Sequence, residues 1–362
     1  MLISIIAVFF TFGIVIFLHE FGHFIVAKLS KIYVEAFSFG FGKELWGFTK
    51  AETRYSIRLI PLGGYVKPKG EDIDEYKGEP DEYFSKPWYT RLAIVLAGPF
   101  MNYVLAFIIF FFVIFFVGQP VPTSKAIIGD VAPNYPAEVA GLKEGDKILS
   151  INSINVDSWK DMSQIIHENP GKELEITYER DGSKIKTKIT ATKSPLDSKM
   201  GIIGIAPLTE YKGVSFFKAI SMSIYQCYFW TAFTVENLAK TIYRMEKPDV
   251  SGPIGIVNIV SKAAHSGFSD YFFLLGLISI AVGFFNLLPI PLLDGGHAFL
   301  YIFEGISKKK LNSNIMKYVN STGMAFLLMI LVFATYNDIM RIYNSKASQK
   351  KVAQEIQKTA DK

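Results

Sequence analysis

The stretch that decides the fold is residues 1–29, MLISIIAVFFTFGIVIFLHEFGHFIVAKL, in which no charged side chain precedes His19. An apolar run of this length is typical of a membrane-spanning helix. On such a helix His19 and His23 lie four residues apart on one face, where both imidazoles can bind one metal ion, and Glu20 can reach a water on that metal. Ionisable side chains inside an apolar span are costly and normally mark a functional site. The stretch therefore predicts a metal site inside the first membrane helix.

The composition is that of a membrane protein with one soluble module. Half of the residues are apolar, and 31 of the 362 are phenylalanine. The formal net charge of +5 suits a membrane surface, and the sequence gives no indication of nucleic acid as a partner. Cys227 is the only cysteine, which excludes an intramolecular disulfide and a metal site built from thiolates.

Four stretches are long and apolar enough to cross a bilayer, so we expect a polytopic α-helical membrane protein with four transmembrane helices. The expected helices cover residues 1–29, 92–118, 251–297 (with the apolar run at 271–293) and 318–341. A cleaved signal peptide is the alternative for the first, but no Lys or Arg precedes its apolar run and no small-residue cleavage site follows.

A fifth apolar stretch, residues 219–235, is short and contains Ser, Gln and Thr among its aromatic residues. A further crossing would also reverse the direction of the span that follows it. We therefore interpret residues 209–250 as amphipathic helices at the membrane interface.

Basic residues that flank the spans predict the topology. Those at positions 28, 31, 86 and 91 place the loop of residues 30–91 in the cytoplasm, so the segment after the second span is extracytoplasmic. Lysines at 308–310 return residues 298–317 to the cytoplasm. The tail, residues 342–362, is also basic, yet an even number of spans places it outside, so its side stays open.

Residues 121–208 have the pattern of a soluble α/β module. The run YPAEVAGLKEGDKILSIN at residues 135–152 predicts a short helix from Pro136, then a turn and a strand. Alternating residues on either side of Asp181 and Gly182 predict a β-hairpin. The module resembles a PDZ domain, whose motif SPAxxAGLxxGDxIlxIN is matched with Tyr135 in place of Ser. Such domains bind extended peptides at a sheet edge, and a mere spacer is the alternative.

The end of the third span supplies another candidate metal ligand. It reads NLLPIPLLDGGH at residues 286–297, where Asp294 is the only acid after a long uncharged run. Two prolines and two glycines break the helix there, and irregular backbone at membrane depth is tolerated only beside protein or a water-filled cavity. The first and third spans both run inward, which brings Asp294 to the depth of His19 and His23. A metal held by two histidines needs at least one more protein ligand.

Together these motifs resemble the site-2 protease family of intramembrane zinc metalloproteases, in the bacterial RseP type but with a single PDZ domain. The pair that carries the resemblance is HExxH at residues 19–23 and NxxPxxxLDGG at residues 286–296. Further matching stretches are GFGKELW at 40–46, IPLGGYVK at 60–67, GPFMN at 98–102 and SGPIGI at 251–256.

The resemblance implies zinc as the cofactor and a role for each matching residue: His19, His23 and Asp294 as zinc ligands, Glu20 as the catalytic base, and Asn286 as a residue that positions the substrate. His297 lies one helical turn beyond the aspartate, and we interpret it as a packing residue or a neighbour of the ligands.

Residues 55–66 alternate between apolar and polar types and predict a membrane-associated β-hairpin that turns at Gly63 and Gly64. A transmembrane helix hides its peptide bonds in its own hydrogen bonds and must unwind before cleavage. We hypothesise that the edge of this hairpin pairs with the unwound substrate and holds it in extended form near the metal. A purely structural hairpin is the alternative.

The resemblance implies an intramembrane protease of the bacterial cytoplasmic (inner) membrane with the PDZ-like module on the extracytoplasmic side. Its expected partners are the lipid bilayer and single-span membrane proteins already cut by another protease, such as anti-sigma factors or remnant signal peptides. The alternative is a membrane-anchored PDZ scaffold with a structural metal site, against which Glu20 argues, because a structural site needs no base. A metal transporter is disfavoured, because its spans would contain several polar residues.

Overall fold

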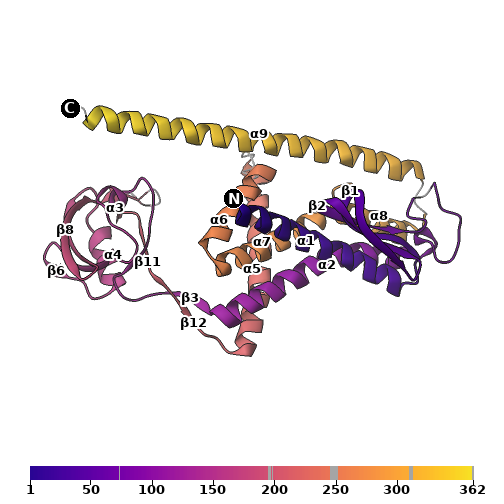
Figure 1. Ribbon diagram of the computed structural model, residues 1–362, viewed down its shortest axis with the longest axis horizontal. Coiled ribbons are helices and arrows are strands. Elements are labelled where there is room, and N and C mark those ends of the chain that lie inside the picture. Colours follow the sequence, from indigo (N-terminus) through magenta and orange to yellow (C-terminus); the bar gives the residue numbers. More distant parts are fainter. Residues whose placement is uncertain (73, 195–196, 198, 245–251, 310–312, 361–362) are drawn as a thin grey trace. The chain divides into compact units, whose positions relative to one another are not determined.

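The computed structural model describes residues 1–362 except 73, 195–196, 198, 245–251, 310–312 and 361–362 (Figure 1). The chain forms two compact units. The helical unit comprises Met1–Val113 together with Phe216–Lys362, and the inserted unit is Ile114–Ser215. The inserted unit therefore extends a few residues beyond the expected module of residues 121–208 at both ends.

The helical unit contains the long apolar helices. Within the described residues, four helices are long and apolar enough to cross a membrane, which confirms the predicted number: Leu2–Leu29, Trp88–Val117, Phe268–Asn286 and Lys317–Tyr343. The helices of this unit are α1 (Leu2–Leu29), α2 (Trp88–Phe112, continued by a π-helical turn at Val113–Val117), α5 (Phe216–Arg244), α6 (Pro253–Ser266), α7 (Phe268–Asn286), α8 (Asp294–Ser307), α9 (Ser313–Ala360) and a short 3-10 turn at Tyr83–Ser85.

The region predicted as one third span, residues 251–297, is divided into three helices instead. Gly267 has a φ of +134° and separates α6 from α7. Pro289 and Pro291 lie in a non-helical segment, residues 287–293, because proline cannot continue a helical hydrogen-bond ladder. The helix α8 then begins at Asp294 and occupies half of the predicted loop at 298–317. The predicted tail likewise continues α9 as helix to Ala360.

The helices α1, α2 and α7 pack around a shared apolar cluster: Val15, Leu105, Ile109, Val113 and Leu275. The backbones of α1 and α2 approach each other closely at Gly22, where a Cβ atom would lie 2.3 Å from the carbonyl oxygen of Ala97. Small residues allow membrane helices to approach this closely. The contact places the residue next to Gly22, which is His23, directly against α2.

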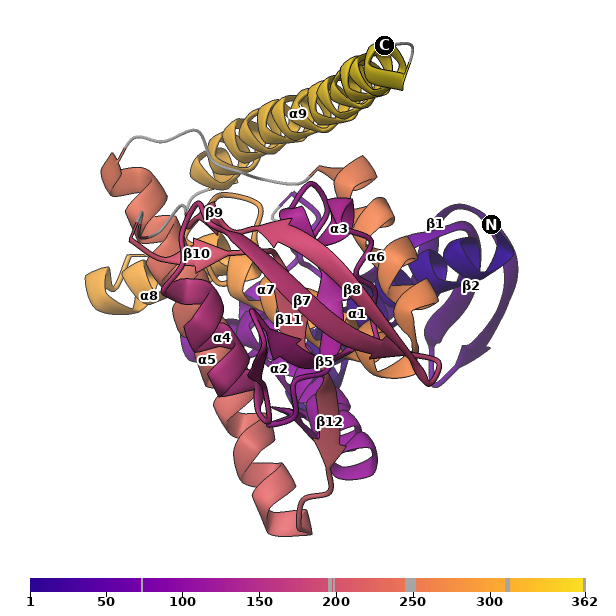
Figure 2. The same cartoon turned by 90° about the vertical axis from the view of Figure 1, so that its left-hand side faces the viewer.

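The helix α5 covers the stretch interpreted as interfacial. It is not among the four candidate spans, and Figure 1 shows it running across α2 rather than along it, while Figure 2 shows its full length. A hydrogen bond of 3.1 Å between Tyr103 Oη and Thr231 Oγ1 joins it to α2. Its location at a membrane surface stays a prediction.

The segment between α1 and α2 forms a β-sheet from β1 (Val34–Lys50) and β2 (Thr53–Pro68). The chain reverses at Ala51 and Glu52, which have positive φ values of 46° and 66°. Both strands bend, so that residues 36–39 stand opposite residues 54–57 and also opposite residues 64–67. Residues 64–68 therefore form an edge strand.

The predicted turn at Gly63 and Gly64 is wrong. A Cβ atom on Gly63 would lie 2.0 Å from the ring of Phe41, and one on Gly64 would lie 2.7 Å from the carbonyl oxygen of Ser38. Both glycines are packed closely against β1. The chain changes direction before Gly64, because residues 36–39 run parallel to residues 54–57 and antiparallel to residues 64–67. Ile57 pairs with both Phe39 and Trp46, so it lies in the interior of the sheet. A proline substitution at Ile57 would disrupt that interior and would not test the edge of the sheet.

The inserted unit is a small α/β domain with its own core. A four-stranded sheet in the order β6-β5-β7-β8 packs with two helices around buried side chains such as Ile148, Leu174 and Met162. Its elements are β3 (Gln119–Pro122), β4 (Ile128–Val131), α3 (Pro136–Val139), β5 (Lys147–Ile151), β6 (Ile154–Asn155), α4 (Trp159–His167), β7 (Glu173–Arg180), β8 (Ser183–Thr190), β9 (Thr192–Lys193), β10 (Gly201–Ile202), β11 (Ile205–Pro207) and β12 (Thr209–Lys212). The strands β7 and β8 pair around Asp181 and Gly182, which confirms the predicted hairpin.

The close contact at Gly22 generates a prediction about stability. Gly22→Ala should lower the stability of the full chain by about 1–3 kcal/mol, because its methyl group would meet the backbone of α2 and force the helices apart. Gly13→Ala on the same helix is the control, since the nearest atom there is the ring edge of Phe39 at 3.1 Å. Thermal unfolding in detergent measures both, and equal midpoints for the two variants would contradict the packing account.

Candidate metal centre

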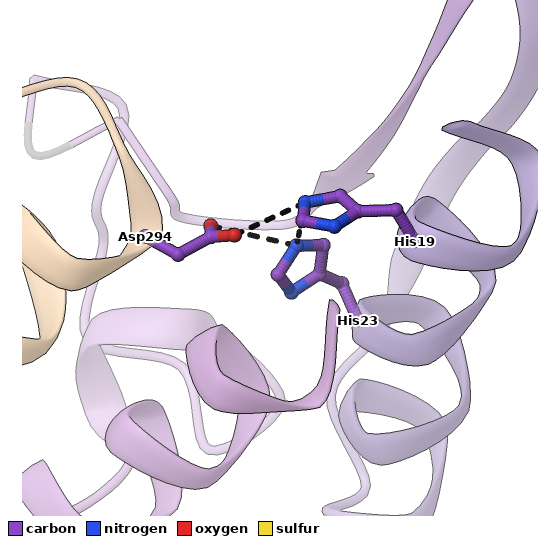
Figure 3. Close-up of side chains that lie close together, drawn as sticks. All are labelled: His19, His23 and Asp294. Atoms are coloured by element: carbon purple, nitrogen blue, oxygen red, sulfur yellow. Dashed lines mark hydrogen bonds and ion pairs between the residues drawn. The ribbon is translucent and has the colours of Figure 1, made fainter. Parts of the chain in front are cut away.

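Three side chains predicted from the sequence meet at one point of the helical unit. The Nε2 atom of His19 lies 3.0 Å from Oδ2 of Asp294, and Nε2 of His23 lies 3.5 Å from Oδ1 of the same carboxylate. The two Nε2 atoms are 3.3 Å apart (Figure 3). All three groups offer a ligand atom within 4.8 Å of one another, which is the spacing of a metal site.

The histidines converge because α1 is continuous through the motif, so residues four apart share a face. The aspartate reaches them from α8, whose first turn is folded tightly under the preceding segment. A Cβ atom on Gly295 would lie 2.2 Å from the carbonyl oxygen of Leu287, and one on Gly296 would lie 2.2 Å from that of Ile290. The Gly-Gly pair thus allows α8 to begin directly beside the end of α7.

The second ring nitrogen of each histidine is also engaged. His23 Nδ1 lies 2.8 Å from the carbonyl oxygen of Ile94, which can only accept, so this nitrogen donates its proton and Nε2 keeps its lone pair. His19 Nδ1 lies 3.1 Å from Nδ2 of Asn102. Both contacts come from α2, so α2 orients ligands that α1 carries.

The helix α2 also leaves room for the site at Gly98. A Cβ atom there would lie 2.3 Å from Nε2 of His23 and 2.9 Å from Nε2 of His19. Sequence reasoning noted residues 98–102 only as a stretch matching a family, and assigned no role to Gly98 or Asn102. The signal that could have identified them is a Gly-Pro pair and an amide inside an otherwise apolar span.

The side chains present fit a bound metal ion. Asp294 Oδ2 is buried and accepts no hydrogen bond among the described residues, although it lies 3.0 Å from His19 Nε2. Two neutral imidazoles that both present lone pairs at Nε2 cannot form a hydrogen bond with each other. A cation placed between them would be bound by both nitrogens and by the carboxylate. Two imidazole nitrogens and one carboxylate oxygen form a donor set found in zinc sites that keep a fourth position open.

Glu20 lies between this cluster and the edge strand of the sheet. Its carboxylate lies near the backbone of Val66. A Cβ atom on Gly64 would lie 3.4 Å from Cγ of Glu20, so the strand runs directly past the side chain. A carboxylate held in this way is fixed next to the metal-type ligands without being one of them.

A cavity of about 820 Å³ opens onto the cluster. Asn286, the predicted substrate-positioning residue, lines it, as do Val66 to Pro68 of the edge strand. The predicted pair Gly63 and Gly64 is absent from its wall and lies just before those residues. The cavity is polar enough to hold water beside the ligands, which hydrolysis requires.

His297 lies on the same cavity wall and stacks on Tyr301 with 6.3 Å between ring centroids. Its Nδ1 atom is buried without a hydrogen-bond partner among the described residues. It does not belong to the three-residue cluster within the described ranges. Glu71 also faces the cavity.

Comparison with known proteins identifies the family. The model of peptidase family M50 matches residues 7–330. This chain belongs to peptidase family M50. It is therefore a metalloprotease, which confirms both the resemblance to site-2 proteases and the predicted enzyme class.

Full-length relatives of this metalloprotease agree with that assignment. A Clostridium acetobutylicum protein provisionally named a zinc metalloprotease is 35% identical over 93% of this chain and 97% of its own length. The regulator of sigma-W protease RasP of Bacillus subtilis is 30% identical over 94% of this chain and 99% of its own length. The family and the four apolar helices make this a multi-pass membrane protein.

Among solved structures, the PDZ domain of an SdrC-like protein from Listeria monocytogenes is similar to part of the chain. It shares 22% identity, covers 24% of this chain and 92% of its own, and has a TM-score of 0.22.

The space at Gly98 generates a prediction about metal content. Gly98→Ala should reduce the metal bound to the purified chain by about tenfold or more at a limiting metal concentration, because its methyl group would displace both imidazoles. Gly276→Ala is the matched control, since its Cβ atom would press on the ring of Phe110 at 2.6 Å, away from the site. Elemental analysis of both variants measures the effect, and full metal content in Gly98→Ala would refute it.

Proposed function

We propose that this member of family M50 is an intramembrane zinc endopeptidase that cleaves the transmembrane segments of single-span membrane proteins. One observation carries the proposal. The three-ligand cluster joins the apolar helix α1 to the start of α8, faces a cavity, and has a non-ligand carboxylate, Glu20, beside it. In this proposal His19, His23 and Asp294 are the zinc ligands and Glu20 is the general base.

Zinc bound at this position supplies an open coordination site, lowers the pKa of a bound water to about 7 and polarises the scissile carbonyl. The chain's own residues provide the remaining chemistry. The Glu20 carboxylate takes a proton from the attacking water and later delivers it to the nitrogen of the leaving amine.

The edge that would hold the substrate is the strand at residues 64–68. Among the described residues this strand pairs with β1 on one side only, and its residues Val66 to Pro68 line the cavity beside Glu20. An unwound substrate segment can add to that edge as a further strand, which exposes its peptide bonds to the site. Asn286 also lines the cavity and can contact the backbone of such a segment.

The partners and location follow from the same proposal. Basic residues flanking the spans support a cytoplasmic metal-proximal loop and an extracytoplasmic inserted domain in the bacterial cytoplasmic membrane. The substrates are single-span proteins shortened beforehand by another protease. The name of the Bacillus subtilis relative, a regulator of sigma-W, supports anti-sigma factors as one substrate class.

The alternative function is a membrane-anchored scaffold whose metal site is structural. A scaffold does not explain why Glu20 lies beside the ligands, because structural zinc sites are closed by four ligands and need no base. The cavity beside the cluster is equally unnecessary for a scaffold.

Cleavage of a model single-span substrate by the full chain in liposomes tests the proposal. Glu20→Gln should lower the turnover rate by about 10²–10⁴-fold while zinc content stays at the wild-type level, because only the proton acceptor is lost. Asp294→Ala should lose both zinc and turnover. Wild-type turnover in Glu20→Gln would favour the scaffold.

The edge strand generates a separate prediction. Val66→Pro removes one backbone donor at the cavity edge, so turnover should fall by about tenfold, the effect of losing about 1.4 kcal/mol of hydrogen bonding. Thr49→Pro is the matched control, because residues 44–50 form the opposite edge of the sheet. Zinc content reports on folding in both variants. Equal turnover in Val66→Pro and the wild type would eliminate the clamp.

A further inference from the structure

Asn102 occupies the junction of three helices and is fully buried. Its side chain faces His19 of α1, with 3.1 Å between Nδ2 and Nδ1. Its backbone carbonyl accepts a hydrogen bond of 2.8 Å from the hydroxyl of Ser279 on α7. A Cβ atom on Gly283 would lie 3.1 Å from Cβ of Asn102, so α7 also confines the side chain sterically. The amide has little freedom apart from rotation about its last bond.

The chemistry of His19 determines what this amide must provide. Because Nε2 of His19 faces Asp294 and His23, a neutral metal-binding imidazole carries its proton on Nδ1. An N–H at Nδ1 needs an acceptor, and an amide NH₂ group is only a donor. The oxygen of the same amide is an acceptor of nearly identical size. A half-turn of the amide therefore converts the contact into a proper hydrogen bond.

Two observations support that half-turn. With Nδ2 toward His19, Oδ1 of Asn102 is buried and has no hydrogen-bond partner among the described residues. The second histidine shows the arrangement directly, because His23 Nδ1 faces the carbonyl oxygen of Ile94, which can only accept. Both ligands are then oriented in the same way, through an Nδ1–H that donates to an oxygen on α2.

We propose that Asn102 is a positioning residue of the metal centre. Its side-chain oxygen accepts the Nδ1–H of His19, fixes the tautomer of that ring and keeps Nε2 directed at the metal. This inference rests on the proposed function, since it takes His19 to be a zinc ligand. Hydrogen bonds to the outer nitrogen of a ligating histidine commonly change metal affinity 10- to 100-fold.

The test is the zinc dissociation constant of the full chain in detergent, measured by competition with a chelator, together with the thermal unfolding midpoint. Asn102→Leu keeps the approximate shape of the side chain but offers no acceptor, so zinc binding should weaken about 10- to 100-fold. Asn102→Asp offers only acceptors toward His19 and should bind zinc close to the wild-type value. Ser279→Ala removes the neighbouring contact to the backbone of Asn102 and should leave the dissociation constant unchanged.

The Asp variant separates positioning from packing. If Asn102→Asp binds zinc as weakly as Asn102→Leu, the amide is not an acceptor for His19 and the inference is overturned. Wild-type affinity in Asn102→Leu overturns it as well. In both cases the wild type still binds zinc, so the proposed function survives. A wild-type chain that binds no zinc removes the proposed function and this inference together.

Discussion

The structure depends on the convergence of two imidazoles and one carboxylate at a single point inside apolar packing. A charged carboxylate and two oriented rings are costly to bury unless each is paired with a cation or a hydrogen-bond partner. The chain meets this requirement by bringing backbones unusually close together. Gly22 admits α2 next to the histidines, and Gly98 leaves the space that the rings fill. The Gly-Gly pair after Asp294 allows the carboxylate to return from α8 to α1.

The same constraint explains why a sheet lies against the first helix. A protease needs water and an extended peptide at the metal, and neither exists in a plain helical bundle. The bent strands β1 and β2 supply an edge of unpaired backbone at residues 64–68, next to Glu20. The cavity of about 820 Å³ beside that edge supplies the space for water. In the proposed function, therefore, the metal ligands, the base and the clamp all belong to elements of the helical unit that pack against one another.

Much of this arrangement could be predicted from the sequence, because the decisive signals are local. A spacing of four residues places His19 and His23 on one helix face, and long apolar runs mark the spans. The hairpin at Asp181 and Gly182 was equally predictable, since its turn residues favour positive φ. The turn at Gly63 and Gly64 was predicted wrongly because the signal there is ambiguous. Glycine indicates either a turn or a close contact, and only the position of Phe41 and Ser38 distinguishes the two.

Asn102 and Gly98 could not be assigned from sequence for a related reason. Their roles exist only through contacts with residues about 80 positions away, and no local pattern records such a contact. The division of residues 251–297 into three helices also depends on packing, because apolar character alone does not show where α6 ends and α7 begins.

The central claim is that one zinc ion is shared between α1 and α8, and X-ray absorption spectroscopy of zinc in the purified full chain tests it most directly. We predict two imidazole nitrogens together with oxygen ligands at about 2.0–2.2 Å, and no sulfur ligand. The absorption signal should lose the carboxylate contribution, or disappear, in Asp294→Ala. An unchanged spectrum in that variant would contradict the account, because the zinc would then be held without α8.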